Sequence, residues 1–540
     1  MASTLPSTVS GATDWNSADE LEISTQGIDT PAEPVTIAPP VAAGAVTSEL
    51  KALARQSSHY TVGLIANLCL GLISFPIYTR VLSVSEYGIM DLGQRLLLML
   101  VIASKLGFQN ASLRFYNREE FATDEGAKKK FYSTIFFGML TTSLTAAALF
   151  QIAALVIPKS ALLGPLTNLL YLILGLTLLR AMGSVLWGFL RIEERTKAYN
   201  GLQVILRGVT LGVVCALFPL IGHVARVYFV AALGVEALMI SGLTGWLVRR
   251  GVLAFRSFDP KFFRIALAFG APLVAYEFAF AALGSADRFL VRHYVGADQL
   301  GLYSVAYGLS NNVNEFLVAP LTLALVPIYM RIWNSDGIEK TTAFLNVACD
   351  IFILVAAGVL AAVAAAGHSV LVLLASSKYA GADHLIPVIL CGLLIWTANV
   401  FVGAGLLIHK QTLKMSGFLV VAAIVNVALN CLLLPKVGLM GGAVACLLSY
   451  LTCIVLLARA SQKVLPLHIN LRRCAQYAIA ALAGFALAVQ IRIDATALNF
   501  LVRGAVVVAV YLSILYAVGG YVRNGADWAM EWARSRRPCA

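Results

Sequence analysis

Charged residues are scarce in this chain of 540 residues. Asp, Glu, Lys and Arg together make up 13% of it, whereas soluble globular domains carry about 25%. Hydrophobic residues reach 59%, and the mean hydropathy is +0.81. Uncharged stretches of about twenty residues or more recur, and this is the length that an α-helix needs to cross a hydrocarbon core of about 30 Å. The composition therefore excludes an ordinary soluble protein and predicts an all-α polytopic membrane protein.

The motifs of several enzyme classes are also missing. The chain has no GxxxxGK[ST] phosphate loop, no DxD acidic pair of the kind that many glycosyltransferases use, and no GxSxG nucleophile motif. The nine cysteines form no CxxC motif and, together with the seven histidines, no cluster with the spacing of metal ligands. We therefore expect no catalytic residue, no metal site and no cofactor, although these absences alone do not rule out a membrane enzyme.

Fourteen segments are apolar and long enough to be transmembrane helices. The segment from Phe131 to Pro158 contains no charged residue at all, whereas three other segments place an ionisable group within the membrane. The predicted spans are 60–81, 89–110, 131–157, 165–189, 199–221, 227–248, 264–285, 303–328, 344–366, 383–408, 414–434, 438–458, 474–491 and 498–520.

The formal net charge of +12 is the kind of excess that nucleic-acid-binding proteins carry, but its distribution indicates another cause. With the amino terminus inside, the inner loops and tails hold 27 Lys and Arg residues and the outer turns hold 8. Inner loops of membrane proteins carry such an excess of basic residues. We therefore expect both termini to be cytoplasmic and expect no nucleic acid partner.

The two ends of the chain differ from the rest in composition. The first fifty residues contain seven acidic residues and no Lys or Arg before Lys51, which predicts a disordered acidic cytoplasmic tail over residues 1–55. No basic segment precedes an apolar one there, so this is not a cleavable signal peptide. Residues 523–540 are predicted to be a cytoplasmic basic tail, in which WAMEWARSRR (528–537) is either an interfacial helix or a frayed end.

Two pairs of similar segments indicate an internal duplication. FPIYTRVLSVSEYGIMDLGQRL (75–96) resembles the segment that begins SADRFLVRHYVGADQLGLYSVAYGL (285–309), at an offset of about 213 residues. GFLRIEERTKAYNG (188–201) resembles GLLIHKQTLKMSG (405–417), at an offset of about 216. The first match aligns Arg80 with Arg292, Glu86 with Asp298, and Gly88 with Gly301. The alternative is that membrane hairpins simply look alike, but two matches at nearly the same offset favour a repeat.

A repeat that starts at the first and seventh spans contains six helices in each copy. An even number keeps both copies in the same orientation, related by an axis along the membrane normal. The prediction is an N-lobe over 56–250, a C-lobe over 251–460, and two further spans over 461–522 as an appendage. Prolines in the first, seventh and eighth spans permit kinks that suit a rocking transporter, namely Pro76, Pro272, Pro320 and Pro327.

Four stretches resemble the Wzx-type polysaccharide and O-antigen flippases of the MOP superfamily, which are relatives of lipid II flippases and of multidrug MATE exporters. They are TRVLSVSEYGIMDL (79–92), SADRFLVRHYVGADQLGLYSVAYGL (285–309), SSKYAGADHLIPVIL (376–390) and NVALNCLLLPKVGLMGGAVACLLSY (426–450). The resemblance covers roughly residues 55–520 and implies a MATE-like fold. It also implies transport of undecaprenyl-pyrophosphate-linked oligosaccharide repeat units across a bacterial inner membrane by alternating access.

Cations within the predicted spans of the N-lobe suit an anionic ligand. Ionisable groups within a membrane usually face a cavity or a partner. We expect a cationic substrate-binding cleft formed by Arg95, Lys105, Arg180 and Arg207, with Glu236 as the only counter-charge at comparable depth and a surplus of about three positive charges. Guanidinium groups pair well with phosphate oxygens. The alternatives are that Arg95 and Lys105 snorkel to the interface and that Arg207 neutralises Glu236.

Other charged residues have different predicted roles. Glu277 and Glu315 in the C-lobe are candidates for proton or sodium coupling or for sugar contact, or are carboxyl groups kept neutral by burial. The candidate residues for the outer hairpins and gating are Arg80, Asp287, Arg288 and Arg292.

The expected partners are the lipid-linked oligosaccharide, membrane lipids and other polysaccharide assembly proteins. Three alternatives stay open: a MATE-like ion-coupled multidrug exporter, a membrane-embedded polymerase or glycosyltransferase, and a scaffold in an assembly complex. A cationic cleft does not suit the exporter, because multidrug substrates are usually cations, and the short outer loops do not suit the enzyme.

Overall fold

The computed structural model describes residues 63, 65–116, 121, 124–156 and 164–519. These residues belong to one compact unit, Arg55–Ala540. In this part of the chain every regular element is a helix, and no β-strand occurs. The tails predicted over 1–55 and 523–540 lie outside the described residues.

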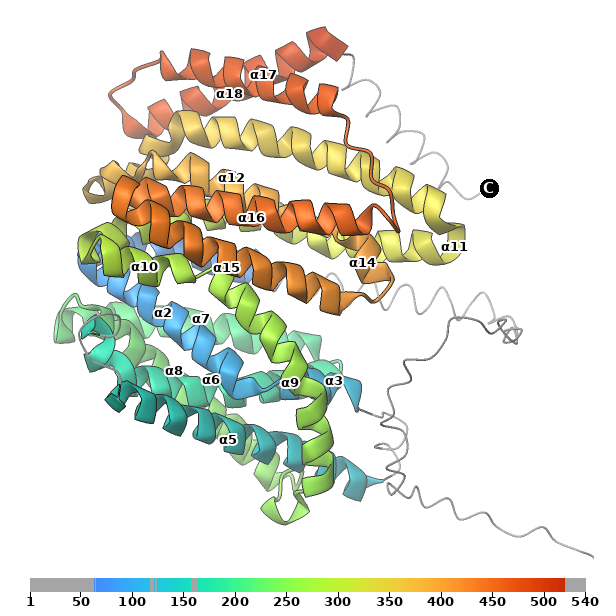
Figure 1. The fold of residues 1–540 in the computed structure, drawn as a ribbon. Helices are drawn as coiled ribbons and strands as arrows, with labels where there is room; N and C mark the ends of the chain where they lie inside the picture. The colour runs from blue at the N-terminus through green and yellow to red at the C-terminus, as the bar shows by residue number, and fades with distance from the viewer. Residues whose placement is uncertain (1–62, 64, 117–120, 122–123, 157–163, 520–540) are drawn as a thin grey trace, which may run out of the picture. The chain divides into compact units, whose positions relative to one another are not determined.

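The predicted N-lobe is a set of helices that pass back and forth beside one another (Figure 1). It begins with the apolar helix Ile65–Val81. The elements that follow are α2 (Val84–Lys105), α3 (Phe108–Arg114), α5 (Glu125–Val156), the 3₁₀ turn η2 (Gly164–Leu169), α6 (Leu170–Ile192), α7 (Thr196–Ile221) and α8 (Ala225–Arg249).

The predicted C-lobe follows a short link at η3 (Phe255–Ser257). Its elements are α9 (Pro260–Leu283), α10 (Ala286–Tyr294), α11 (Ala297–Leu374), η4 (Ser377–Ala382), α12 (Leu385–Thr397), α13 (Asn399–Val402), α14 (Ala404–Ile408), α15 (Thr412–Val437) and α16 (Leu439–Ser461). The last two helices are α17 (Leu471–Val489) and α18 (Thr496–Gly519).

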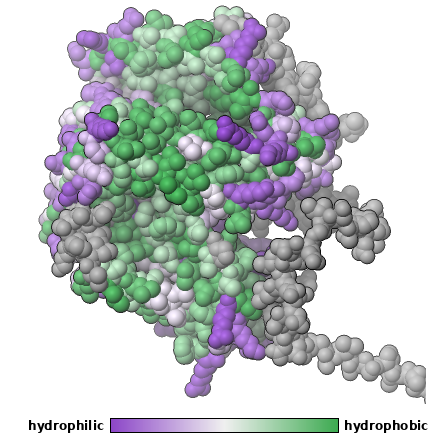
Figure 2. Space-filling model, in the orientation of Figure 1, coloured by the Kyte–Doolittle hydropathy of each residue, from purple (hydrophilic) through white to green (hydrophobic). Residues whose placement is uncertain are grey.

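The length and hydrophobicity of these helices are those of membrane spans. Within the described residues, ten helices are long and apolar enough to cross a membrane, or eleven if the bent α9 counts as one span. Figure 2 shows hydrophobic residues over the middle of the helices and hydrophilic residues gathered toward their two ends. The chain is therefore a multi-pass membrane protein, while the count of fourteen spans stays a prediction.

The helix α2 begins and ends earlier than the predicted span 89–110. It begins at Val84 because Ser83 is its N-cap: the Ser83 hydroxyl accepts a hydrogen bond from the backbone N–H of Glu86. It ends at Lys105 because Leu106 and Gly107 both have positive φ angles, of 40° and 75°. The chain then restarts as the separate helix α3.

The predicted loop between the eighth and ninth spans is largely helical. The helix α11 runs from Ala297 to Leu374, with a single non-helical residue, Gly337 (φ 78°, ψ −162°). The chain turns at this glycine and runs back beside itself (Figure 1). The residues between the predicted spans 303–328 and 344–366 thus continue the two helices, and a single glycine makes the turn.

Two further predicted spans are interrupted helices. The halves Pro260–Ala271 and Leu273–Leu283 of α9 meet at an angle of 41°, at the predicted kink of Pro272. The predicted span 383–408 is divided into α12, α13 and α14, with breaks at Ala398 and Gly403.

The two C-terminal helices are bound firmly to α11 by polar contacts. Asp350 of α11 accepts hydrogen bonds from Arg473 (2.9 Å) and from the hydroxyl of Tyr477 (3.1 Å), both on α17. From α18, Arg503 donates to the carbonyl of Ala365 (2.9 Å), and Tyr511 donates to that of Leu354 (2.7 Å). These helices are thus packed against the second half of α11.

Two pairs of glycines bring the predicted lobes into backbone contact. A Cβ atom on Gly88 of α2 would lie 2.8 Å from the backbone nitrogen of Gly301 in α11. At the other end of α2, a Cβ atom on Gly107 would lie 2.2 Å from the Cα of Gly270 in α9. Neither contact leaves room for a side chain, and a cavity lies along α2 between these two points.

Candidate functional site

A cavity of about 670 Å³ extends along α2 between the two glycine contacts. It is lined by residues of the helix Ile65–Val81, of α2, α6, α7 and α8, and of the start of α11. All four cations predicted to form a substrate-binding cleft line this one cavity: Arg95, Lys105, Arg180 and Arg207. The structure therefore brings together residues that lie on three different helices, α2, α6 and α7.

Arg180 of α6 forms a two-pronged ion pair with Glu236 of α8. The Nε atom of Arg180 lies 3.0 Å from Oε1 and 3.3 Å from Oε2 of Glu236, and Nη2 lies 2.9 Å from Oε1. The Arg180 side chain is 33% exposed, whereas that of Glu236 is 9% exposed. The pair is neutral as a unit, and both of its residues line the cavity.

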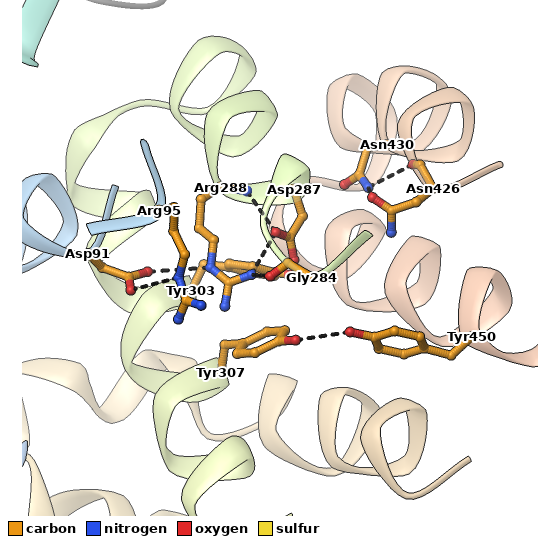
Figure 3. A network of polar contacts seen from close by, with 10 residues as sticks. All are labelled: Asp91, Arg95, Gly284, Asp287, Arg288, Tyr303, Tyr307, Asn426, Asn430 and Tyr450. Carbon is orange, nitrogen blue, oxygen red and sulfur yellow. Dashed lines mark hydrogen bonds and ion pairs between the residues drawn. The ribbon is translucent and has the colours of Figure 1, made fainter. Parts of the chain in front are cut away.

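Asp91 of α2 lies between two arginines from different parts of the chain (Figure 3). Its Oδ1 is 3.2 Å from Nε of Arg95, one helical turn away, and its Oδ2 is 3.3 Å from Nε of Arg288 in α10. Asp91 and Arg95 line the cavity, while Arg288 lies behind them and is fully buried. The carboxylate thus links the predicted N-lobe to the predicted C-lobe.

Arg288 is held by further polar and aromatic groups (Figure 3). Its Nη1 donates to Asp287 (2.8 Å) and to the carbonyl of Gly284 (2.6 Å). The guanidinium carbon lies 3.7 Å from the ring centroid of Tyr307, and the hydroxyl of Tyr303 donates to Asp287 at 2.6 Å. A fully buried guanidinium requires such partners, because an unpaired charge away from water is very costly.

Lys105 and Arg207 differ from the other two cations of the cavity. Lys105 Nζ donates to Oε1 of Gln109 at 3.1 Å, and Arg207 Nη1 donates to the carbonyl of Asn67 at 3.1 Å. Within the described residues neither forms an ion pair with a carboxylate. The lining therefore contains four cations and two carboxylates, which leaves an excess of about two positive charges.

The charge pattern corrects one expectation from the sequence and excludes one of the alternatives to it. Glu236 is not the only counter-charge, because Asp91 also lines the cavity, and the surplus is smaller than three. Glu236 pairs with Arg180 and not with Arg207, which faces Asn67 instead. The sequence did carry a signal for Asp91, since Asp91 and Arg95 are four residues apart on one helix, where opposite charges meet.

The two glutamates of the predicted C-lobe do not line this cavity. Glu277 of α9 accepts a hydrogen bond from Nδ2 of Asn110 at 3.2 Å. Glu315 of α11 is half-buried. Their predicted part in ion coupling or sugar contact stays a prediction.

The residues predicted to fix the outer hairpins lie in two different settings. Arg80 is exposed and donates to the carbonyl of Leu373 at 2.7 Å, while Lys378 donates to the carbonyls of Arg80 (3.1 Å) and Leu82. Asp287 and Arg288 are fully buried rather than at an exposed corner, because α10 folds them against α2 and α11. Arg292 is half-buried, further along α10.

Residues 53–333, which are slightly more than half of the chain, match the family described as "Polysaccharide biosynthesis protein". The chain belongs to this family. No protein of curated function matches it by sequence.

Solved structures show the same fold at low sequence identity. The lipid II flippase MurJ, in an inward closed conformation, has a TM-score of 0.66 at 13% identity, covering 84% of this chain and 97% of its own. The match to an inward-facing multidrug MATE transporter has a TM-score of 0.55 at 14% identity, and it covers 74% of this chain and 94% of the transporter. A third match is a MOP superfamily transporter from Pyrococcus furiosus, which is described as having a binding pocket of reversed polarity. This match has a TM-score of 0.54 at 15% identity and covers 76% of this chain and 95% of that transporter.

The fold of this family member is thus that of the MurJ and MATE transporters. At 13% and 14% identity, this similarity establishes the fold of the chain. The cavity along α2, lined mainly by helices of the predicted N-lobe and by the start of α11, is its candidate functional site.

Proposed function

We propose that this chain is a flippase that moves undecaprenyl-pyrophosphate-linked oligosaccharide repeat units across a bacterial inner membrane for surface polysaccharide synthesis. Both termini are cytoplasmic in this proposal, as the distribution of basic residues suggests. The cavity alternately opens to the two sides of the membrane while the lipid-linked head group is bound.

The observation that carries the proposal is the charge of the cavity. Lys105 and Arg207 line it without a hydrogen-bonded carboxylate, so a bound pyrophosphate would find charge-assisted donors there. The family description names polysaccharide biosynthesis, which agrees with a sugar-containing substrate.

The fold similarity to a multidrug exporter supports a second candidate function. A cavity with excess positive charge repels the cationic compounds that such exporters usually carry, so the lipid-linked anion is favoured. Coupling to a proton or sodium gradient, and contacts with other polysaccharide assembly proteins, belong to the proposal and have no assigned residues beyond Glu277 and Glu315.

Deletion of the gene tests the proposal. Lipid-linked oligosaccharides would be separated by chromatography and the surface polysaccharides assayed in the same strain. We expect the loss of one polymer and the accumulation of a complete lipid-linked repeat unit on the cytoplasmic leaflet. Normal polymer and an unchanged lipid pool, in a strain without a second homologue, would favour the drug exporter.

A further inference from the structure

We propose that the link between the two predicted lobes forms a binding surface for the head groups of anionic phospholipids. This link surface consists of residues 124–130, around the start of α5, and residues 249–261, from the end of α8 to the start of α9. None of these residues lines the cavity. The surface is therefore separate from the candidate functional site, and its role does not depend on the proposed function.

The link surface lies at the ends of three apolar helices. α5 begins at Glu125, α8 ends at Arg249 and α9 begins at Pro260. α5 and α8 are each long and apolar enough to cross a membrane, and so is α9 if its two halves count as one span. Residues at the ends of membrane spans lie at the level of the lipid head groups. In the topology of the proposed function this is the cytoplasmic level, where anionic lipids give the membrane a negative surface potential.

Hydrogen bonds hold the link against the first turns of α5. The backbone N–H of Ala254 donates to the hydroxyl of Ser133 at 3.0 Å, and that of Asp259 donates to the hydroxyl of Thr134 at 2.9 Å. Lys130 lies three residues before Ser133, or about 4.5 Å along the helix axis. The basic residues of α5 and those of the link therefore form one continuous surface.

Basic residues outnumber acidic residues in the link surface. It contains seven Lys and Arg residues and three acidic residues. Two of the acidic side chains cap helices, since Oδ1 of Asp124 accepts hydrogen bonds from two backbone N–H groups at the start of α5, and Oδ1 of Asp259 accepts from two at the start of α9. Their charges thus face the positive ends of helix dipoles, and the surface keeps a positive excess that an anion can bind. The basic residues are Lys128, Lys129, Lys130, Arg249, Arg250, Arg256 and Lys261.

Two exposed aromatic side chains accompany these cations. Phe255 in η3 is 75% exposed, although its ring meets that of Phe137 edge-on at 5.3 Å between centroids. Trp246 of α8 is 40% exposed, and the guanidinium carbon of Arg250 lies 4.2 Å from its ring centroid. At the ends of membrane spans, exposed aromatic rings enter the boundary between head groups and acyl chains, while nearby arginines contact lipid phosphates. A lipid satisfies both kinds of side chain, whereas a soluble anion leaves Phe255 in water.

Lipid binding to the purified full-length protein tests the link surface. The protein in a non-ionic detergent is titrated with phosphatidylglycerol, and native mass spectrometry measures how much of this lipid stays bound. Phosphatidylcholine, whose head group is zwitterionic, is titrated in parallel, and inorganic phosphate is added as a competitor at constant ionic strength. We expect the protein to retain phosphatidylglycerol in preference to phosphatidylcholine, and we expect inorganic phosphate not to displace it.

A triple variant removes three cations of the link surface. It combines Lys130→Gln, Arg250→Gln and Arg256→Gln, and all three side chains are exposed, so the fold should tolerate the changes. We expect its affinity for phosphatidylglycerol to fall by about tenfold or more, because each basic residue near an anionic membrane surface adds to the attraction.

A second triple variant is the matched control. It removes the same amount of charge from exposed residues of the predicted C-lobe, on the same predicted side of the membrane, by Lys410→Gln, Lys414→Gln and Lys463→Gln. Its affinity for phosphatidylglycerol should stay within about twofold of the wild-type value. Phe255→Ala leaves the net charge unchanged but removes the exposed ring, and it should weaken binding by about threefold or more.

Four results would overturn the proposal. Equal losses in the two triple variants would show that the net charge of the protein alone attracts anionic lipids. Unchanged binding in the variant of Lys130, Arg250 and Arg256, or in Phe255→Ala, would show that the lipid does not contact this surface. Equal retention of phosphatidylcholine and phosphatidylglycerol by the wild-type protein would exclude selection of an anionic head group. Displacement of phosphatidylglycerol by inorganic phosphate would assign the surface to a soluble anion.

Discussion

Gly88 of α2 and Gly301 of α11 contact each other through their backbones, although 213 residues separate them in the chain. A Cβ atom on Gly301 would lie 1.9 Å from the carbonyl oxygen of Val84. The same two glycines are aligned by the predicted internal duplication. Two copies related by an axis along the membrane normal would meet at such a pair of equivalent positions.

Substitution of Gly301 by alanine should disturb this contact. The new methyl group meets backbone atoms of α2, which cannot move aside as the end of a side chain can. We expect a clear fall in the melting temperature of the purified protein and a loss of polymer export. Gly234→Ala in α8 is the control, because nothing lies within 4 Å of its Cβ position. Equal melting temperatures for the two variants would contradict the close approach.

The contact between Gly107 and Gly270 allows a sharper comparison. Gly107→Ala combines a strained backbone, with φ at 75°, and a clash with Gly270. Gly251→Ala has a similar φ of 72° but open space around the Cβ position. Strain of this kind costs about 1–2 kcal/mol in both variants. Only Gly107→Ala should lose more than this in unfolding free energy, and equal losses would mean that the helices do not approach closely there.

Asp91→Asn tests the link between the predicted lobes. The change leaves the fully buried Arg288 with Asp287 as its remaining carboxylate partner and also unpairs Arg95. Removal of one partner of a buried ion pair typically costs about 3–5 kcal/mol of stability. The measurement is thermal unfolding in detergent. Asp336→Asn, which breaks the exposed pair with Lys340, should leave the melting temperature nearly unchanged.

Lys378 in η4, the turn after α11, forms hydrogen bonds with the end of the helix Ile65–Val81. Lys378→Met removes its hydrogen bonds to the carbonyls of Arg80 and Leu82. The loss of donors to these carbonyls should cost about 1–3 kcal/mol in unfolding free energy. Lys340→Met, which alters an exposed lysine, serves as the comparison in the same unfolding experiment. A Lys378→Met protein as stable as Lys340→Met would exclude a structural role for this contact.

The sequence was sufficient to predict an all-α multi-pass membrane protein and to nominate the four cations of the cavity. Membrane spans and inner basic loops follow from local composition, which is why these features could be read directly. The four cations could be nominated because a charge within the membrane nearly always faces a cavity or a partner.

The pairing of those charges could not be predicted in the same way. From the sequence, Arg207 was the alternative partner considered for Glu236, and the packing of α6 against α8 instead pairs Glu236 with Arg180. The pair of Asp91 and Arg288 joins residues 197 positions apart and depends on α10 folding inward. Likewise, composition does not show that Gly337 alone makes the turn within α11.

The most direct test of the central claim is transport by the purified protein in vesicles. Undecaprenyl-pyrophosphate-linked oligosaccharide would be placed in both leaflets, and the fraction that an added external glycosidase can reach would be followed with time. The account predicts rapid access to the inner-leaflet pool with the wild-type protein, and a rate reduced about tenfold or more by Lys105→Gln or Arg207→Gln. A rate no faster than in protein-free vesicles, or one unchanged by both substitutions, would contradict it.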